Sequence, residues 1–194
     1  MPENKENWGY PNTVWFGNGR INDLPKACKI LNIKKPLFVT DKDLAKTSMV
    51  LSVIELIKKN SLPTEIFSEL KGNPLGSHVL NGVEKFKSRN HDGIIAFGGG
   101  SSLDVGKSIA LQAATNRPLW DFTEGGSFWN EIDYDKSMAI NKISNPDNIK
   151  PIVAIPTTAG TGSETSRAAA IINNKTNVKK IVFHPRMLPT LTIL

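Results

Sequence analysis

The chain has 194 residues, of which 39% are hydrophobic and 22% charged, and its formal net charge is +6 at pH 7. This length is enough for one α/β domain and short for two, so we expect a single domain over residues 1–194. No apolar run approaches the roughly 18–20 residues that a membrane-spanning helix needs. The amino terminus also lacks the basic flank and apolar stretch of a secretory signal, which favours a cytoplasmic protein.

The positive charge does not indicate a nucleic-acid-binding protein. The lysines stand as scattered short pairs, and the sequence shows no basic stripe with interleaved aromatic residues. We therefore expect a solvated basic surface, with the phosphates of a small cofactor as the bound anions. The single cysteine, Cys28, cannot form an internal disulfide, and its apolar neighbours Leu24, Ala27 and Leu31 predict a core position.

The first ninety or so residues alternate short apolar runs with segments of helical periodicity, which is typical of an α/β protein. The predicted strands cover residues 13–16, 36–40 and 65–67. The predicted helices cover residues 21–31, a segment ending near Asn60, and a segment whose buried face is Val79, Val83 and Phe86. We interpret residues 13–40 as a first βαβ unit, with Asp41 or Asp43 as the cap of the helix that ends near Asn60.

The clearest predicted strand, residues 93–97, is apolar throughout, as expected of a parallel strand buried on both faces. It runs directly into Gly98-Gly99-Gly100-Ser101, and a helix is predicted from Ser102 to about Ala114. Glycines let a phosphate approach the backbone, and the N–H groups and dipole at a helix amino terminus attract anions. The segment therefore predicts a phosphate-binding loop, with a plain glycine-rich turn as the alternative.

Two widespread phosphate-binding motifs do not fit this loop. Gly106-Lys107-Ser108 would supply the end of a Walker A loop, but the first glycine of that motif would fall on Ser101. In the Gly-x-Gly-x-x-Gly motif of an ordinary Rossmann domain, the third glycine would fall on Leu103. That motif also belongs to the first strand–helix turn of its domain, and this loop lies late in the chain. A P-loop NTPase and an ordinary Rossmann fingerprint are therefore disfavoured.

The remaining chain contains a second small-residue loop between further strands. Residues 115–150 are polar with isolated aromatic residues, and we interpret them as a long surface excursion. The predicted elements after it are a strand at 151–155, a loop at 156–164, a hairpin at 168–183, and a strand at 191–194. Because the backbone edge of an apolar terminal strand needs a partner, we expect the chain to be a truncated piece of a longer protein.

Both small-residue loops resemble signatures of one protein family. Residues 98–107, GGGSSLDVGK, resemble the GGGSxxDxxK signature of the iron-containing (group III) alcohol dehydrogenases, and residues 156–164, PTTAGTGSE, match their second loop. The resemblance extends from about Thr13 to Leu194. It implies a Rossmann-like α/β fold with a mainly parallel sheet, of the dehydroquinate-synthase-like type. It also implies that this chain is the nucleotide-binding domain that precedes an all-helical domain absent here.

The family's activity implies hydride transfer between a small alcohol or aldehyde and NAD, with NADP less favoured. A stand-alone dinucleotide-binding module without catalysis is the alternative. The first loop would hold the cofactor pyrophosphate, and the second would close over the cofactor. The implied cofactor-binding residues are Asp41, Asn73, Gly98, Gly99, Gly100, Ser101, Asp104, Thr157, Thr158, Thr161, Gly162 and Lys180.

Some of these assignments have alternatives. A carboxylate at Asp41 would bind the adenosine ribose and repel the 2′-phosphate of NADP, but a helix cap would also explain it. Asp104 and Lys107 would order the loop or approach the cofactor, and an intrahelical ion pair explains their spacing as well. Lys180 aligns with the family's lysine near the nicotinamide ribose, with Lys179 as the alternative by one residue.

The family's metal, Fe²⁺ or Zn²⁺, is held by one aspartate and three histidines in the carboxyl-terminal domain, which would begin after Leu194. We therefore expect no catalytic or metal-binding residues in this chain and no turnover from it alone. Its histidines, His78, His91 and His184, give no pair on one helix face, and each is expected at the surface or in a turn. The full-length enzyme is expected to be a homo-oligomer.

Overall fold

A computed structural model of the chain describes residues 12–131, 146 and 148–194, and it has six parallel strands in one sheet. The sheet order is β1–β8–β5–β4–β2–β3. The bounds are β1 (Thr13–Trp15), β2 (Pro36–Val39), β3 (Glu65–Phe67), β4 (Gly93–Gly98), β5 (Ile152–Pro156) and β8 (Leu191–Ile193). Strands β2, β4 and β8 are buried along their whole length, because layers cover both faces of the sheet. The predicted α/β fold with a parallel sheet is confirmed.

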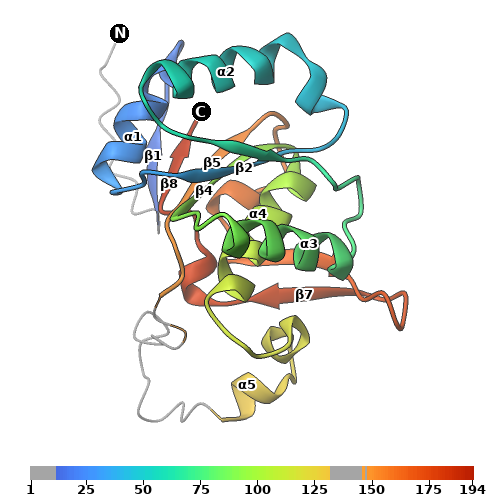
Figure 1. Cartoon of the computed structure of the whole chain (residues 1–194). Helices are drawn as coiled ribbons and strands as arrows, with labels where there is room; N and C mark the ends of the chain where they lie inside the picture. The colour runs from blue at the N-terminus through green and yellow to red at the C-terminus, as the bar shows by residue number, and fades with distance from the viewer. Residues whose placement is uncertain (1–11, 132–145, 147) are drawn as a thin grey trace, which may run out of the picture.

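Helices cover the two faces of the sheet in pairs (Figure 1). The four longest are α1 (Leu24–Ile30), α2 (Ser48–Lys59), α3 (Gly76–Ser88) and α4 (Gly100–Ala113). Successive strand side chains point to opposite faces, so Phe38 and Ile95 pack in the core below α1 and α2. Their neighbours Leu37 and Ile94 pack in the core with α3 and α4. Each short apolar strand therefore contributes side chains to the hydrophobic core on both faces of the sheet.

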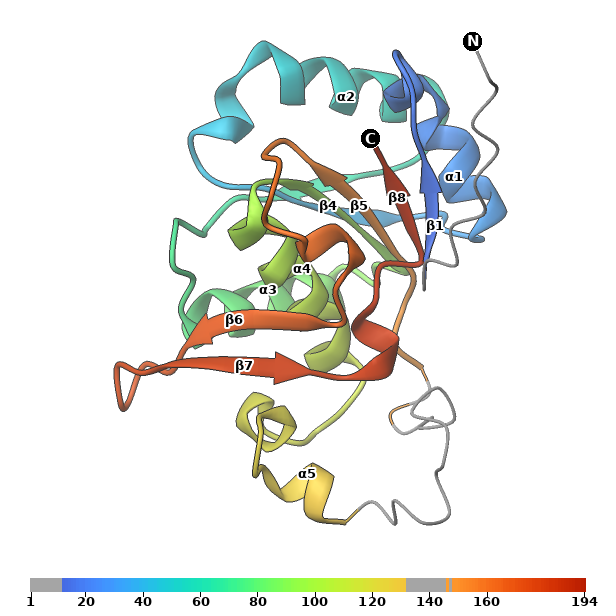
Figure 2. The same ribbon diagram turned by 180° about the vertical axis from the view of Figure 1, so that it is seen from behind.

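A hairpin forms a third layer, and α4 lies between it and the sheet (Figures 1 and 2). The hairpin pairs β6 (Ala168–Ile172) with β7 (Lys179–Phe183) in antiparallel fashion, as predicted. Because α4 is covered from two sides, its buried residues run from Ser102 to Gln112 with one interruption, at Asp104. The shorter helices are η1 (Arg20–Asp23), η2 (Leu44–Lys46), η3 (Leu119–Phe122), α5 (Ser127–Asn130), η5 (Ser163–Thr165) and η6 (Pro185–Met187).

The strands at either end of residues 13–40 are not neighbours in the sheet. β1 pairs with β8, and β2 pairs with β3 and β4, so three strands separate β1 from β2. The predicted βαβ unit thus joins two parallel strands of one sheet that are not neighbours, because hydrophobic periodicity carries no information on strand order. The strands β2 and β3, which α2 joins, are neighbours.

The carboxyl-terminal strand β8 is paired on both sides. Leu191 stands opposite Thr13 on β1 and opposite Val153 on β5. The N–H of Leu194 donates to the carbonyl oxygen of Trp15 at 2.9 Å. The partner that the edge of this strand needs is therefore a distant strand from the start of the chain.

The polar stretch after α4 was also misinterpreted where the structure describes it. Phe122, Phe128 and Trp129 are 0%, 3% and 6% exposed, so residues 115–131 pack against the molecule instead of forming a surface excursion. The Trp129 ring stacks on Phe183 at 4.4 Å between centroids. The rest of the predicted excursion, residues 132–145 and 147, lies outside the described residues.

Each histidine was expected at the surface or in a turn. His78 is half-exposed, whereas His91 and His184 are buried in the short connections that follow α3 and β7, so a surface position was wrong for these two. His184 packs against the rings of Phe122 and Phe128. Cys28 has the predicted core position, and burial raises the pKa of its thiol to about 12.

Close packing of α4 on the sheet depends on Gly106. A Cβ atom at this position would lie 2.8 Å from the Ala96 Cβ on β4. We expect Gly106→Val to lower the free energy of unfolding by about 1–3 kcal/mol or more, because the helix must move off the sheet. Urea denaturation measures this change. Gly72→Val is the control, because a Cβ at Gly72 meets no atom within 4 Å. Equal stability of the two variants would contradict the expectation.

Candidate functional site

The two small-residue loops leave the sheet side by side, at the carboxyl ends of the adjacent strands β4 and β5. Gly98, the last residue of β4, stands opposite Pro156, the last residue of β5. The N–H of Thr157 donates to the carbonyl oxygen of Gly98 at 3.0 Å. Gly98 has φ +136°, and a Cβ there would lie 2.8 Å from the Ser102 Oγ. This turn therefore requires glycine.

The glycines of the first loop lie where the second loop approaches the start of α4. Gly99 is the residue before α4, and a Cβ on it would lie 3.3 Å from the Thr158 Oγ1. A Cβ on Gly100 would lie 3.2 Å from the Thr161 Cβ. Glycine thus keeps the first N–H groups of α4 uncovered, and such groups have no acceptor within their own helix. The arrangement can hold an anion.

A cleft of about 460 Å³ is lined in part by residues of these two loops. Six of the predicted site residues line it: Asp41, Gly99, Gly100, Ser101, Thr157 and Thr158. Five further lining residues were not predicted: Asp43, Leu44, Thr47, Gly72 and Ser102. All of these except Ser102 lie in the segments that follow β2 and β3. Their place after a predicted strand is the one feature of the sequence that could have identified them.

The cleft has a topological reason to lie here. The chain leaves β2 toward α2 on one face of the sheet and leaves β4 toward α4 on the other, although β2 and β4 are neighbours. Ligands of open α/β sheets bind in the crevice that forms at such a point. The fold and the cleft therefore define a Rossmann-like protein whose candidate ligand site lies where the chain leaves the neighbouring strands β2 and β4 toward opposite faces of the sheet.

Asp41 lies at the border of this cleft and also caps a short helix. Its Oδ1 accepts hydrogen bonds from the N–H of Asp43 at 3.1 Å and of Leu44 at 2.8 Å, at the start of η2. The longer helix α2 is capped by Thr47, whose Oγ1 accepts from the N–H of Val50. The expected cap of α2 by Asp41 or Asp43 was thus wrong, because η2 intervenes. The capping bonds fix the Asp41 carboxylate beside the cleft.

Asp104 and Lys107 form the ion pair that their spacing allows, at 3.2 Å, and they also bind the second loop. The fully buried Lys107 donates from Nζ to the carbonyl oxygens of Ser163 at 2.9 Å and Ser166 at 3.3 Å, and to that of Ala168. Asp104 accepts from the Ser163 Oγ at 2.6 Å. Burial lowers the pKa of Lys107, and the nearby Asp104 carboxylate opposes that shift.

The remaining predicted site residues do not line the cleft. Asn73 has φ +54°, and its Oδ1 accepts from the Lys179 Nζ at 2.7 Å, which ties the hairpin to the turn that holds Gly72. Lys180 is half-buried on β7, opposite Ile171. Gly162 has φ +68° at the start of η5. Gly98 and Asp104 contact the loops as described above, and Thr161 is an exposed residue of the second loop, but none of the three lines the cleft.

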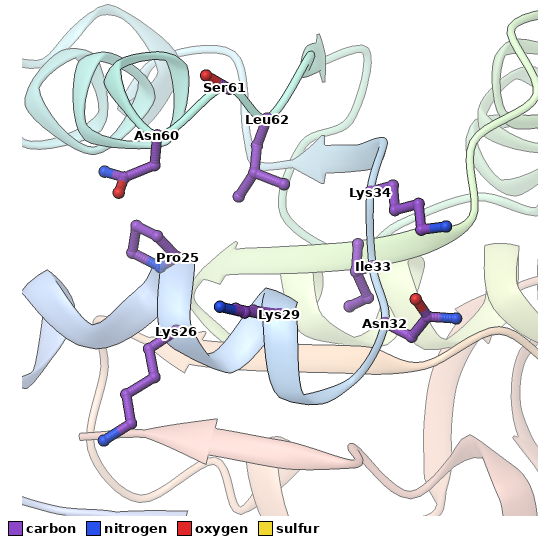
Figure 3. A pocket seen from close by; sticks show the side chains of 9 residues that line it. All are labelled: Pro25, Lys26, Lys29, Asn32, Ile33, Lys34, Asn60, Ser61 and Leu62. Carbon is purple, nitrogen blue, oxygen red and sulfur yellow. The ribbon is translucent and has the colours of Figure 1, made fainter.

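A second hollow of about 500 Å³ lies between α1 and the end of α2. It sits at the amino ends of β2 and β3, on the edge of the sheet opposite the loops. Three lysines border it, but the ammonium groups of Lys26 and Lys34 extend away from each other (Figure 3). This hollow therefore lacks the convergent polar groups of a ligand site.

In residues 12–131, 146 and 148–194, no group of three or more His, Cys, Asp or Glu residues is placed to hold a metal ion. Within the same part of the chain, no helix is long and apolar enough to cross a membrane.

Comparison with known proteins identifies the family. The model of the iron-containing alcohol dehydrogenases matches residues 11–194, and the chain belongs to this family. A 1,3-propanediol dehydrogenase of Citrobacter freundii is 33% identical over 94% of this chain and 43% of its own length. An NAD-dependent methanol dehydrogenase of Bacillus methanolicus is 32% identical over 97% of this chain and 45% of its own length.

Solved structures agree with this assignment. A 1,3-propanediol oxidoreductase superimposes with a TM-score of 0.80 and 32% identity, over 97% of this chain and 45% of the other. An NADH-dependent butanol dehydrogenase of Thermotoga maritima gives a TM-score of 0.79 and 27% identity, over 97% of this chain and 44% of the other. The chain thus spans less than half the length of these relatives.

Proposed function

We propose that residues 1–194 are the NAD-binding domain of a metal-dependent alcohol dehydrogenase that transfers a hydride between a small alcohol or aldehyde and the cofactor. The observation that carries the proposal is the cleft at the β2–β4 switch, where glycines at the start of α4 meet the threonines of the second loop. The relatives named NAD-dependent or NADH-dependent support the choice of cofactor. Titration of the chain with NAD tests it, and absence of binding would overturn it.

The described residues fit a dinucleotide. The N–H groups of Gly100 and Ser101 at the start of α4 would hold the pyrophosphate, where a Cβ on Gly99 or Gly100 would crowd the second loop. Asp41 would accept from the adenosine ribose hydroxyls. Thr157 and Thr158 would cover the cofactor from the other side and exclude water. The cofactor supplies the hydride chemistry, and this chain orients it.

The described residues do not fit the metal. His78 accepts from the Leu75 N–H through Nδ1, and His184 accepts from the Arg186 N–H in the same way. His91 is buried at the other edge of the sheet, beside Lys35. Histidines directed at separate parts of the fold cannot form one first coordination shell. We propose that Fe²⁺ or Zn²⁺ binds residues in the part of the family's length that this chain does not span.

Turnover is accordingly expected to be absent from the chain by itself. Without a metal to polarise the alcohol oxygen, several kcal/mol of transition-state stabilisation are missing. The purified chain, with ferrous iron or zinc added, is expected to bind NAD and to form no NADH from short primary alcohols and diols. Absorbance at the NADH band checks this, with an intact family enzyme as the positive control. Metal-dependent turnover would contradict the expectation.

Preference for NAD over NADP is expected to depend on the charge of Asp41. Asp41→Asn keeps an oxygen that accepts from the Leu44 N–H but removes the charge that repels a 2′-phosphate. We expect the unmodified chain to bind NAD at least about tenfold more tightly than NADP, a difference of ~1.4 kcal/mol, and Asp41→Asn to narrow that ratio. Calorimetric titration with both cofactors measures it. Asp92→Asn is the matched control, because Asp92 also accepts from backbone N–H groups, those of Lys34 and Lys35, and does not line the cleft. Equal affinities for NAD and NADP in the unmodified chain would refute the assigned role.

A further inference from the structure

The second loop has an exposed arm and an anchored end. Residues 157–161 are exposed, and Gly160 and Gly162 adopt left-handed conformations in open space. From Ser163, which is buried, the chain turns into η5 and then into β6. The position of the arm over the cleft therefore depends on what holds the segment 163–168.

Two side chains of α4 hold that segment. Lys107 bonds three of its carbonyl oxygens, at residues 163, 166 and 168. Asp104 accepts from the Ser163 Oγ through Oδ1 at 2.6 Å and from the Ala170 N–H through Oδ2 at 2.9 Å. The same helix begins at the first loop, so α4 fixes both loops of the cleft in one rigid unit.

The Asp104 carboxylate points away from the cleft in this arrangement. Both of its oxygens accept from the second loop or from β6, and Oδ1 also lies 3.2 Å from the Lys107 Nζ. A buried lysine with a carboxylate partner contributes little to stability in many proteins, and in some it specifies one conformation. Here the specified conformation is that of the exposed arm, residues 157–161, which we call the threonine arm.

We propose that Lys107 and Asp104 are positioning residues, which hold Thr158 and Thr161 against Gly99 and Gly100 and touch no part of the cofactor. This inference rests on the proposed binding of NAD in the cleft. It reassigns Asp104, which the family resemblance implied as a cofactor-binding residue. Of the roles that the sequence left open for Lys107, it selects the ordering of the second loop.

The test compares two ligands that use different parts of the cleft. Inorganic pyrophosphate needs only the first loop, and NAD needs the threonine arm as well. Lys107→Met is expected to weaken NAD binding about tenfold, because the segment 163–168 loses its charged donor, and to leave pyrophosphate affinity within about twofold. Hydrogen exchange is expected to speed up at the amides of residues 162–170 in the same variant.

Ser163→Ala is the second variant, and it keeps the inference testable if Lys107→Met does not fold. It removes the Ser163–Asp104 hydrogen bond, whose residues do not line the cleft, and is expected to weaken NAD binding in the same selective way. Lys85→Met is the matched control, since Lys85 donates to the Ile66 carbonyl oxygen at 2.9 Å on the remote β3 edge. It is expected to leave both affinities unchanged.

The possible results separate the inference from the proposed function. If the unmodified chain binds neither ligand, the proposed function fails. If it binds both, and Ser163→Ala and a folded Lys107→Met retain full NAD affinity, the positioning role is wrong. Equal weakening of NAD and pyrophosphate would also overturn it, because that result indicates a general loss of structure.

Discussion

Gly100→Val is expected to abolish NAD binding, with a loss of affinity of at least about 100-fold, or ~2.7 kcal/mol. A single Cβ at this position already lies 3.2 Å from the Thr161 Cβ. The two further methyl carbons of valine would push the second loop away from α4 and cover the N–H groups that hold the pyrophosphate. The free energy of unfolding is expected to change little, because the start of α4 borders the open cleft. Calorimetric titration gives the affinity.

Gly106→Val in the same helix is the matched comparison, and it should show the opposite pattern. Gly106 packs against the sheet and does not line the cleft, so its variant is expected to lose stability and to retain NAD affinity when folded. Unchanged NAD affinity in Gly100→Val would contradict the location of the pyrophosphate at the start of α4.

Asp104→Ala is expected to lower the free energy of unfolding by about 3–5 kcal/mol, because it leaves the fully buried Lys107 ammonium without its anion. The Ala170 N–H and the Ser163 hydroxyl lose their acceptor as well. Such a loss is a large part of the ~5–15 kcal/mol that stabilises an ordinary domain. Denaturation in urea measures it.

The double variant Asp104→Ala, Lys107→Met provides the control. With the charge removed, it is expected to recover much of the lost stability, although it should bind NAD as weakly as Lys107→Met alone. A double variant less stable than Asp104→Ala would show that the buried charge is not the cause of the loss.

The stability of Asp104→Ala is expected to rise with pH. The folded-state pKa of Lys107 lies below 10.5, chiefly because of desolvation, so the folded chain binds fewer protons than the unfolded chain between that pKa and 10.5. The free energy of unfolding therefore increases with pH through this window, and below the folded-state pKa it stays at its lower value. Removing Asp104 lowers that pKa further, which widens the window. Denaturation of the variant at about pH 7 and about pH 10, compared with the unmodified chain, measures the effect.

Local features of the chain were predictable because local patterns cause them. The apolar strand 93–97 runs into three glycines and a helix start, and this combination specified the first loop and its place at a strand end. The hairpin of β6 and β7 followed from two short strands around a turn of Asn and Lys. The start of α4 was misplaced by two residues, since Gly100 and Ser101 belong to the helix.

By itself the sequence determined the class of fold, the two loops and the family, since each depends on residues that are close together in the chain. Tertiary structure alone decided the order of the strands in the sheet, in which β8 lies between β1 and β5. It also buried His184 among aromatic rings and directed Asp104 and Lys107 toward residues 163–170. The physical reason is that strand order, burial and hydrogen-bond partners depend on which distant segments pack together. Hydrophobic periodicity and motif spacing carry information only on the structure of nearby residues in the chain.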